Sequence, residues 1–180
     1  MRDEAAQTEF TPFHSSRQAN PNSAVVRFTP QPGSRYHVRV RLAEGQAGRF
    51  HLAVLGAGLQ HVTAADSVCF PADGSAVVAV GAVDGEGRRL GYSACGSTRR
   101  PGKPELVGVV PFVSSWRQQP FSGTSAAAPQ AAGLATLWWS HYPGRTAEQV
   151  RGVLRASARD LGPRGCDPET GYGLIQLPRE

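Results

Sequence analysis

The feature that most constrains the fold is a stretch of small and apolar residues that runs from Ala126 to Tyr142. Gly123-Thr124-Ser125 leads into this stretch and Pro143-Gly144 ends it, as at the two ends of a helix. A helix that is apolar on every side belongs in the middle of a domain. The sequence therefore predicts a globular domain built around one buried helix, and it excludes a coiled coil.

The elements around this helix predict an α/β fold. The run Val77–Val83 is continuously apolar, which is typical of a strand buried on both faces in a parallel sheet. Thr146 and Gln149 have the spacing of a capping box, which opens an amphipathic helix that ends before Gly162-Pro163. Gly171–Leu177 has the pattern of a last strand. Strand, buried helix, surface helix and strand in this order indicate an α/β domain.

The chain ahead of this domain has a different pattern. Alternation of apolar and polar residues predicts strands at Ala24–Phe28, Tyr36–Leu42 and Phe50–Val54, the last two forming a hairpin. These strands are typical of part of an antiparallel sheet, and the character of the sequence changes again at about residue 62. We therefore expect two regions, an antiparallel β part over 1–61 and an α/β part over 62–180.

Composition excludes several classes of protein. The net charge is +5, but the arginines are spread along the chain and Lys103 is the single lysine, so no nucleic-acid surface is predicted. No run of eighteen apolar residues exists, so no membrane span is expected. The first ten residues do not resemble a secretory signal, so we expect either that the protein stays inside the cell or that Met1 is not the true start. The three cysteines allow one disulfide at most and lack metal-ligand spacing.

Ser125 is the candidate site residue. It lies at the expected start of the apolar helix, where unpaired N–H groups and the helix dipole favour negative charge. This position suits a nucleophile whose own N–H faces a developing oxyanion, and Gly123 allows a close backbone approach. Serine and threonine at a helix start are also common caps, so Ser125 and Thr124 have a purely structural interpretation as well.

The sequence resembles the subtilisin-like serine proteases over residues 66 to 177. The catalytic-serine motif of that family is similar to Gly123–Pro129 followed by Ala132-Gly133. Four further segments resemble family landmarks and come in the same order: Phe70-Pro71-Ala72 with the strand after it, Gly91–Gly96 (Phe-Ser-Ser-x-Gly), Lys103–Val107 (Lys-Pro-Asp-hydrophobic) and Gly171–Ile175 (the closing strand). Residues 24–65 resemble, more weakly, the end of a β-sandwich insert that some subtilases carry before the Pro-Ala turn.

The resemblance implies the C-terminal portion of a subtilisin-like domain, with Ser125 as the nucleophile of a serine endopeptidase, supported by Gly123 and Thr124. It implies protein or peptide substrates and a secreted or cell-surface location. Subtilases often bind calcium, so the resemblance makes calcium the candidate metal, although no loop of the chain matches a calcium site that we can name. No cofactor is expected. The catalytic Asp and His signatures and the Ala-Gly-Asn oxyanion segment are absent from the sequence. We therefore expect this chain to need the missing N-terminal part of the domain as a partner and to be inactive alone.

Two alternatives remain. The chain could be a non-catalytic subtilase-derived binding or scaffold module, in which Ser125 only caps a helix. It could also be a relative of the serine-carboxyl peptidases, which share the Gly-Thr-Ser element, although Lys103-Pro104 favours the subtilisins. The other polar residues are weaker candidates. His37 and His51 are expected on a solvated sheet face, and the remaining candidates at turns are expected to be caps rather than calcium ligands: Asp66, Asp73, Asp84 and Asp167.

Overall fold

A computed structural model describes residues 25–40, 45–48, 50–97 and 102–178 of the chain. The chain divides into two compact units, residues 1–48 and residues 49–180, and each is described by itself. Within the described residues, all regular strands and helices belong to the second unit.

The described part of the first unit is a turn without paired strands. The rings of Phe28 and Tyr36 pack with their centroids 4.8 Å apart, and the N–H of Gln31 donates to the Tyr36 hydroxyl at 2.7 Å. No strand is assigned within residues 25–40 or 45–48, and alternating apolar residues such as Val38 are exposed. The β-sandwich prediction is therefore not confirmed. Ala24 and residues 41–44 of the predicted strands lie outside the described residues.

The segment Phe50–Val54, which belongs to the second unit, is likewise not a strand in the structure. Its apolar side chains Phe50, Leu52 and Val54 are all exposed. Alternation of apolar residues stabilises a strand only when a partner strand and a packed face are present. The prediction of a strand at Phe50–Val54 was therefore wrong for this structure.

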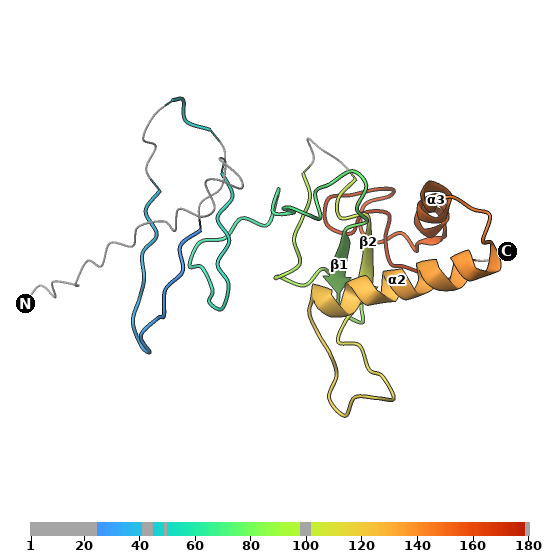
Figure 1. The fold of residues 1–180 in the computed structure, drawn as a ribbon, viewed down its shortest axis with the longest axis horizontal. Helices are drawn as coiled ribbons and strands as arrows, with labels where there is room; N and C mark the ends of the chain where they lie inside the picture. The colour runs from blue at the N-terminus through green and yellow to red at the C-terminus, as the bar shows by residue number, and fades with distance from the viewer. Residues whose placement is uncertain (1–24, 41–44, 49, 98–101, 179–180) are drawn as a thin grey trace, which may run out of the picture. The chain divides into compact units, whose positions relative to one another are not determined.

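The core of the second unit is a parallel pair of short strands, β1 (Val80–Val83) and β2 (Leu106–Val109), shown in Figure 1. Val80 is in register with Leu106 and Val83 with Val109. The predicted apolar strand is thus confirmed but is shorter than expected. Most of its side chains are buried, as required of a parallel sheet that is covered on both faces.

The chain that follows the last helix returns to the sheet, where residues 173–175 pair with the edge of β2 that is not bonded to β1. The N–H of Val107 donates to the carbonyl of Gly173 at 3.0 Å, and the N–H of Ile175 donates to the carbonyl of Val107 at 3.0 Å. These bonds form an isolated parallel bridge between Val107 and Leu174 rather than a full strand. The predicted final strand at Gly171–Leu177 is therefore reduced to isolated bridges: this parallel one, and antiparallel ones from Leu174 to Arg159 and from Gly171 to Asp167.

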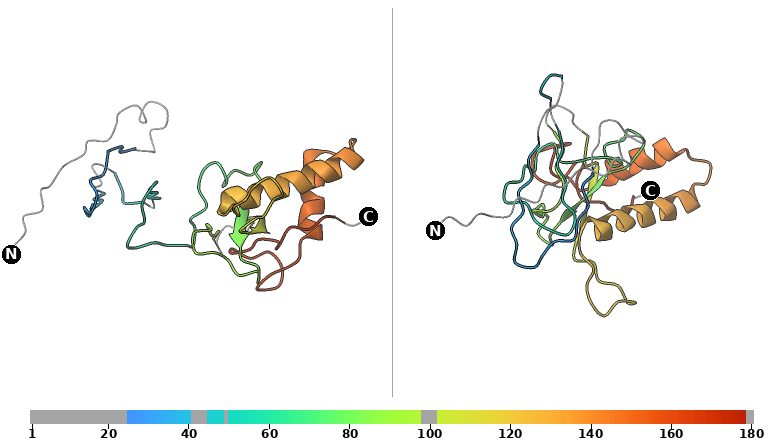
Figure 2. Two further views of the ribbon diagram at one scale, coloured as in Figure 1. Left: turned by 90° about the horizontal axis from the view of Figure 1, so that it is seen from below. Right: turned by 60° about the vertical axis from the view of Figure 1, so that its left-hand side comes forward.

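Helix α2 (Thr124–His141) lies across one side of the two strands (Figures 1 and 2). Its first turn approaches β2 closely because Gly108 has no side chain: a Cβ at that position would lie 3.1 Å from both Cα and Cβ of Ala127. Ala126, Ala127 and Ala131 are buried against the sheet. The small residues of the sequence thus allow the helix and the sheet to pack at short range.

The expectation that α2 is buried on every side was wrong for the described residues. One side of the helix faces the strands, but the other side is exposed, with Leu137 47% and Trp139 40% accessible. The apolar sequence predicts burial in a complete core, whereas a helix packed on one face buries only one stripe. No helix in the described part of the chain is long and apolar enough for a membrane crossing.

Helix α3 (Ala147–Ser157) is amphipathic and begins at the predicted capping box. The Thr146 hydroxyl accepts a hydrogen bond from the Gln149 N–H at 3.3 Å, and the Gln149 side-chain carbonyl accepts one from the Thr146 N–H at 2.9 Å. The buried face of α3, with Val150 and Leu154, packs in one cluster with Leu106 of β2. The predicted start of the helix, with its capping box, is thus confirmed, whereas the helix ends at Ser157, earlier than the predicted end at Gly162-Pro163.

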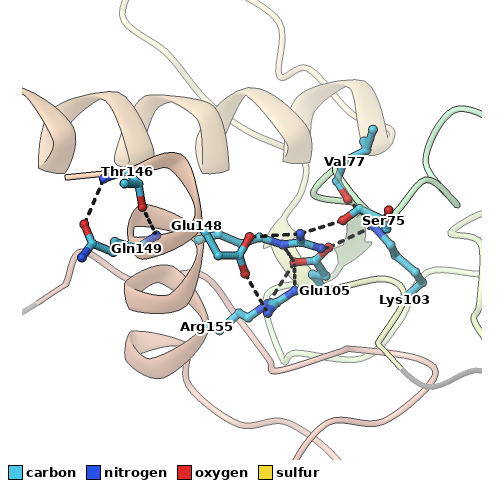
Figure 3. A network of polar contacts seen from close by, with 9 residues as sticks. Ser75, Val77, Lys103, Glu105, Thr146, Glu148, Gln149 and Arg155 are labelled. Atoms are coloured by element: carbon cyan, nitrogen blue, oxygen red, sulfur yellow. Dashed lines mark hydrogen bonds and ion pairs between the residues drawn. The ribbon is translucent and has the colours of Figure 1, made fainter.

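A buried carboxylate joins α3 to the start of β2. Glu105 is fully buried, and its oxygens accept hydrogen bonds from Lys103 at 2.9 Å, from Arg151 at 2.5 and 2.8 Å and from Arg155 at 2.8 and 3.0 Å (Figure 3). Arg151 also donates to the carbonyl of Ser75 at 2.7 Å. A buried charge is tolerated when it is paired and fully hydrogen-bonded, as this one is.

Candidate functional site

Ser125 is the second residue of α2 and its side chain is exposed. The N-cap of the helix is Gly123, which has φ 90° and no side chain to donate or accept a capping bond. A positive φ of this size is unfavourable for residues with a Cβ, so glycine suits the turn that directs the chain into the helix. Ser125 is therefore not the residue at the capping position, which weighs against the interpretation of this serine as a cap.

The polar groups of Ser125 are unpaired within the described part of the chain. The first N–H groups of a helix have no partner inside the helix, and no hydrogen bond is recorded from the Ser125 N–H or Oγ to any described residue. The next N–H, that of Ala126, is bonded to the Gly123 carbonyl at 2.9 Å. Ser125 thus presents a hydroxyl and an N–H at the positive end of the α2 dipole.

A tyrosine from the loop after β1 contacts the turn before α2. The Tyr92 hydroxyl accepts a hydrogen bond from the Gly123 N–H at 3.2 Å and lies 3.3 Å from the Ser122 hydroxyl. The sequence places Tyr92 in a family-like segment but indicates no role for it. Because Tyr92 and Ser122 are 30 positions apart, only the fold brings them together.

Gln130 fixes the first turns of α2 to the end of β2. Its side-chain amide donates to the carbonyl of Val109 and to the carbonyl of Ala126, each at 2.9 Å. In the sequence, Gln130 stands where the family often has histidine, and this difference predicts no change in the chemistry of the site. In the structure this side chain is a second support for the helix segment that holds Ser125.

Residues 112–121, just before the turn at Ser122-Gly123, form an exposed loop. Phe112 and Phe121 exchange two backbone hydrogen bonds, of 2.7 and 2.9 Å, which close the loop at its base. Arg117 lies over the Phe121 ring, 4.7 Å from its centroid, and Trp116 at the tip is exposed. This loop extends into solvent from the same end of α2 that holds Ser125 (Figure 1).

No histidine side chain is hydrogen-bonded to Ser125 among the described residues. His37 belongs to the first unit, and His51 and His61 are exposed in the second. His141 ends α2, and at 1.5 Å per residue its backbone lies about 24 Å along the helix from that of Ser125. Within the part of the chain that the structure describes, Ser125 therefore has no hydrogen-bonded histidine to act as its base.

The aspartates near turns act as turn caps where the structure gives their contacts. Asp84 accepts from the N–H groups of Glu86 and Arg88, at 3.0 and 2.9 Å, and the bonds from Arg88 hold the Asp84 pKa below its usual value. Asp167 accepts from the N–H groups of Glu169 and Thr170. Among the described residues, no group of three or more metal-ligating side chains is placed to hold an ion.

The sequence model of a family described as "Subtilase family" matches residues 26–173 of this chain. Among curated proteins, the subtilisin-like protease PopC of Myxococcus xanthus is 33% identical over 181 aligned positions, which cover 91% of this chain and 37% of that protein. Subtilisin DY of Bacillus licheniformis is 37% identical over 103 positions, covering 54% of this chain and 35% of that protein.

Solved structures give the same result for the fold. The CspB protease of Clostridium perfringens matches with a TM-score of 0.55 at 25% identity, over 66% of this chain and 28% of that one. The described fold, with its small parallel sheet and the helix that follows the glycine turn, is thus similar to subtilisin-like structures. This chain spans between 35% and 37% of the length of the first curated relatives that it matches.

Proposed function

The chain belongs to the subtilase family, and from this premise we propose that it supplies the nucleophile Ser125 to a serine endopeptidase. The observation that carries the proposal is the position of Ser125, exposed and unpaired in the first turn of α2 within the Gly-Thr-Ser motif. Gly123 shapes the turn before the serine and Thr124 begins the helix, so both are assigned supporting roles.

The proposed reaction is the hydrolysis of a peptide bond through an acyl-enzyme. A histidine takes the proton of the Ser125 hydroxyl while Oγ forms a bond to the substrate carbonyl carbon. The C–N bond then breaks, the leaving amine takes the proton, and water hydrolyses the ester. The Ser125 N–H and an asparagine amide would stabilise the oxyanion. The substrates are accordingly proteins or peptides.

The histidine, its aspartate and the asparagine must come from polypeptide other than these 180 residues. The missing signatures support this proposal, and so do two uncovered surfaces of the second unit. The outer side of α2 exposes Leu137 and Trp139. On β1, the backbone N–H and C=O groups of even-numbered residues face away from β2. Those of Ala82 are bonded to Ser93 and Leu90, so the edge is open only at Val80, whose backbone groups have no recorded partner within the described chain. We propose that the rest of a subtilase domain covers both surfaces.

Three further assignments are proposals that follow from the family. Residues 62–180 would form the C-terminal part of the peptidase domain, and residues 1–61 a separate insert-like region. Two of the matched relatives are named extracellular proteases, which supports a secreted or cell-surface location. Calcium stays a prediction from the family, to be tested by comparing the unfolding temperature with and without a chelator.

The test uses the native polypeptide that contains this chain, assayed with casein beside its Ser125→Ala variant. We expect proteolysis by the wild type and almost none by the variant, whereas the 180-residue chain alone should show no turnover above its own Ser125→Ala control. In subtilisin, loss of the histidine costs roughly 10⁶ in kcat. Cleavage by the native polypeptide that does not depend on Ser125 would refute the assignment, and Ser125-dependent cleavage by the isolated chain would refute the need for a partner.

The lack of triad partners for Ser125 favours a second candidate function, that of a non-catalytic module derived from the family. The sequence holds none of the partner signatures of a triad, and no histidine among the described residues is hydrogen-bonded to Ser125. Cooperative unfolding of the monomeric chain, together with an inactive native polypeptide, would establish this alternative. The matched family and the relatives described above are subtilisin-like, which favours the subtilisin interpretation over the serine-carboxyl peptidase alternative.

A further inference from the structure

We propose that Tyr92 is a positioning residue for Ser125, acting through the turn at Ser122-Gly123. The inference rests on the proposed function. The Tyr92 hydroxyl receives the Gly123 N–H at 3.2 Å and lies 3.3 Å from the Ser122 Oγ. Gly123 is the N-cap of α2, two residues before the nucleophile. The contact therefore acts on the backbone that sets where Ser125 Oγ and its N–H point.

Tyr92 is well placed to hold that turn because its own segment is fixed to the sheet. The neighbouring Ser93 is buried, and its hydroxyl accepts the N–H of Ala82 in β1 at 2.9 Å. The guanidinium of Arg89 donates to the carbonyls of Leu90 and Ser93, at 3.1 and 2.7 Å. Tyr92 thus extends from the segment 89–93, which several hydrogen bonds hold in place, toward the turn at Ser122-Gly123, which has few.

The turn that receives the contact needs an external support. Gly123 has φ 90°, a region that glycine enters freely, and it has no side chain to restrain it. A Cβ built at Gly123 would meet only the Ser125 nitrogen, at 3.8 Å, so packing does not restrain this residue either. The Tyr92 side chain is itself 57% exposed, but it extends from a backbone segment that is held to the sheet, so a hydrogen bond from the Gly123 N–H to its hydroxyl narrows the orientations that the residues after Gly123 can adopt.

Residues 92–96 resemble the family segment Phe-Ser-Ser-x-Gly, and this chain has Tyr92 where that segment has phenylalanine. The Tyr92 hydroxyl is therefore the added group. A phenylalanine at position 92 should therefore fit without rearrangement, and Tyr92→Phe removes only the oxygen. Because the family acts without this oxygen, the expected effect is modest. One net hydrogen bond corresponds to a change of about three- to tenfold.

The first measurement is made in the native polypeptide used to test Ser125. Tyr92→Phe is expected to lower kcat by about three- to tenfold with little change in KM, while Tyr142→Phe, at the far end of α2 with no recorded hydroxyl bond in the described chain, leaves both unchanged. Ser122→Ala separates the two contacts: if Tyr92 acts through Gly123, this variant retains most of the wild-type kcat. Equal kcat values for wild type and Tyr92→Phe overturn the proposal.

The second measurement does not depend on activity. In the 180-residue chain, amide exchange of Gly123 followed by NMR should become about three- to tenfold faster in Tyr92→Phe, with the amides of β1 and β2 unaffected. Unchanged exchange at Gly123 overturns the inference whatever the assay shows. If Ser125→Ala proves that the native polypeptide is not a serine protease, the proposed function fails, and the exchange result alone then decides whether Tyr92 holds the turn.

Discussion

Arg151 of α3 binds the buried Glu105 carboxylate with two hydrogen bonds, from Nε at 2.8 Å and from Nη2 at 2.5 Å. Burial by itself raises the pKa of Glu105, but the hydrogen bonds from Arg151, Lys103 and Arg155 outweigh it, so the pKa lies below its ordinary value. The carboxylate is therefore ionised in the folded chain and ties the surface helix α3 to the start of β2.

Replacing this carboxylate should destabilise the chain strongly. Glu105→Gln leaves three cationic side chains without their shared partner, and breaking a buried ion pair costs about 3–5 kcal/mol. The matched control is Glu148→Gln, whose side chain is 72% exposed beside the same arginines and should change the free energy of unfolding by less than about 0.5 kcal/mol. Urea unfolding of both variants measures this; similar values for the two would contradict the role of Glu105.

The lowered pKa of Glu105 also predicts an acid-dependent loss of stability. The folded state binds a proton at this carboxyl less readily than the unfolded state, where the ordinary value is 4.5. The contribution is thus complete above about pH 4.5 and is lost as the pH falls through the folded-state pKa. Unfolding curves at about pH 7 and below about pH 4.5 should show that wild type loses more stability than Glu105→Gln. A parallel loss in both proteins would refute the prediction.

Gly108→Ala should disrupt the contact between β2 and α2. The new methyl group would lie 3.1 Å from the Ala127 Cα, a backbone atom that cannot move away cheaply, and overpacking of this kind costs about 1–3 kcal/mol. Gly152→Ala on α3 is the control, because a Cβ there meets nothing within 4 Å and should stabilise the helix by roughly 0.5–1 kcal/mol. Thermal unfolding should shift in opposite directions for the two; shifts of the same sign would be evidence against this packing.

Thr146→Ala should weaken the start of α3. The change removes the hydroxyl that accepts the Gln149 N–H, and loss of an N-cap of this type costs about 0.5–2 kcal/mol. Thr136→Ala is a suitable comparison. Among the described residues, the Thr136 hydroxyl bonds only to the Ala132 carbonyl within α2, and threonine is a weaker helix former than alanine. We expect a lower midpoint of urea unfolding for Thr146→Ala and no decrease for Thr136→Ala; the reverse order would exclude the cap.

The three thiols should react with DTNB at different rates. Cys69 is exposed, whereas Cys95 is buried, and burial raises the pKa of the Cys95 and Cys166 thiols. Since the thiolate is the reactive form, we expect Cys69 to react first at about pH 8 and Cys95 last, with the difference lost in about 6 M guanidinium chloride. Rapid labelling of Cys95 in the folded chain would show that this residue is accessible.

The local features of this fold could be predicted from the sequence, and the long-range ones could not. The capping box at Thr146 and Gln149 depends on residues three positions apart, and it forms as expected. The start of α2 beside Ser125 is local in the same way. By contrast, Arg151 and Glu105 are 46 positions apart and Tyr92 and Ser122 are 30 apart, so no pattern in the sequence indicates either contact.

The errors have the same origin. The alternating residues of Tyr36–Val40 predict a half-buried strand, but a strand also needs a partner with which to exchange hydrogen bonds, and the described structure supplies none there. The apolar sequence of α2 predicts burial on every side, which depends on what else packs around the helix. The spacing of apolar residues in a sequence shows which face of a strand or helix could be buried. Whether that face is buried depends on the tertiary structure around it.

The pairing of Val107 with the segment Gly173–Ile175 constrains how the second unit can be made by a ribosome. Until the chain has been translated through Ile175, one edge of β2 has no partner, although β1 and α2 have already emerged. Nascent intermediates would therefore display an open strand edge through the synthesis of both helices, a period in which such edges are prone to aggregate.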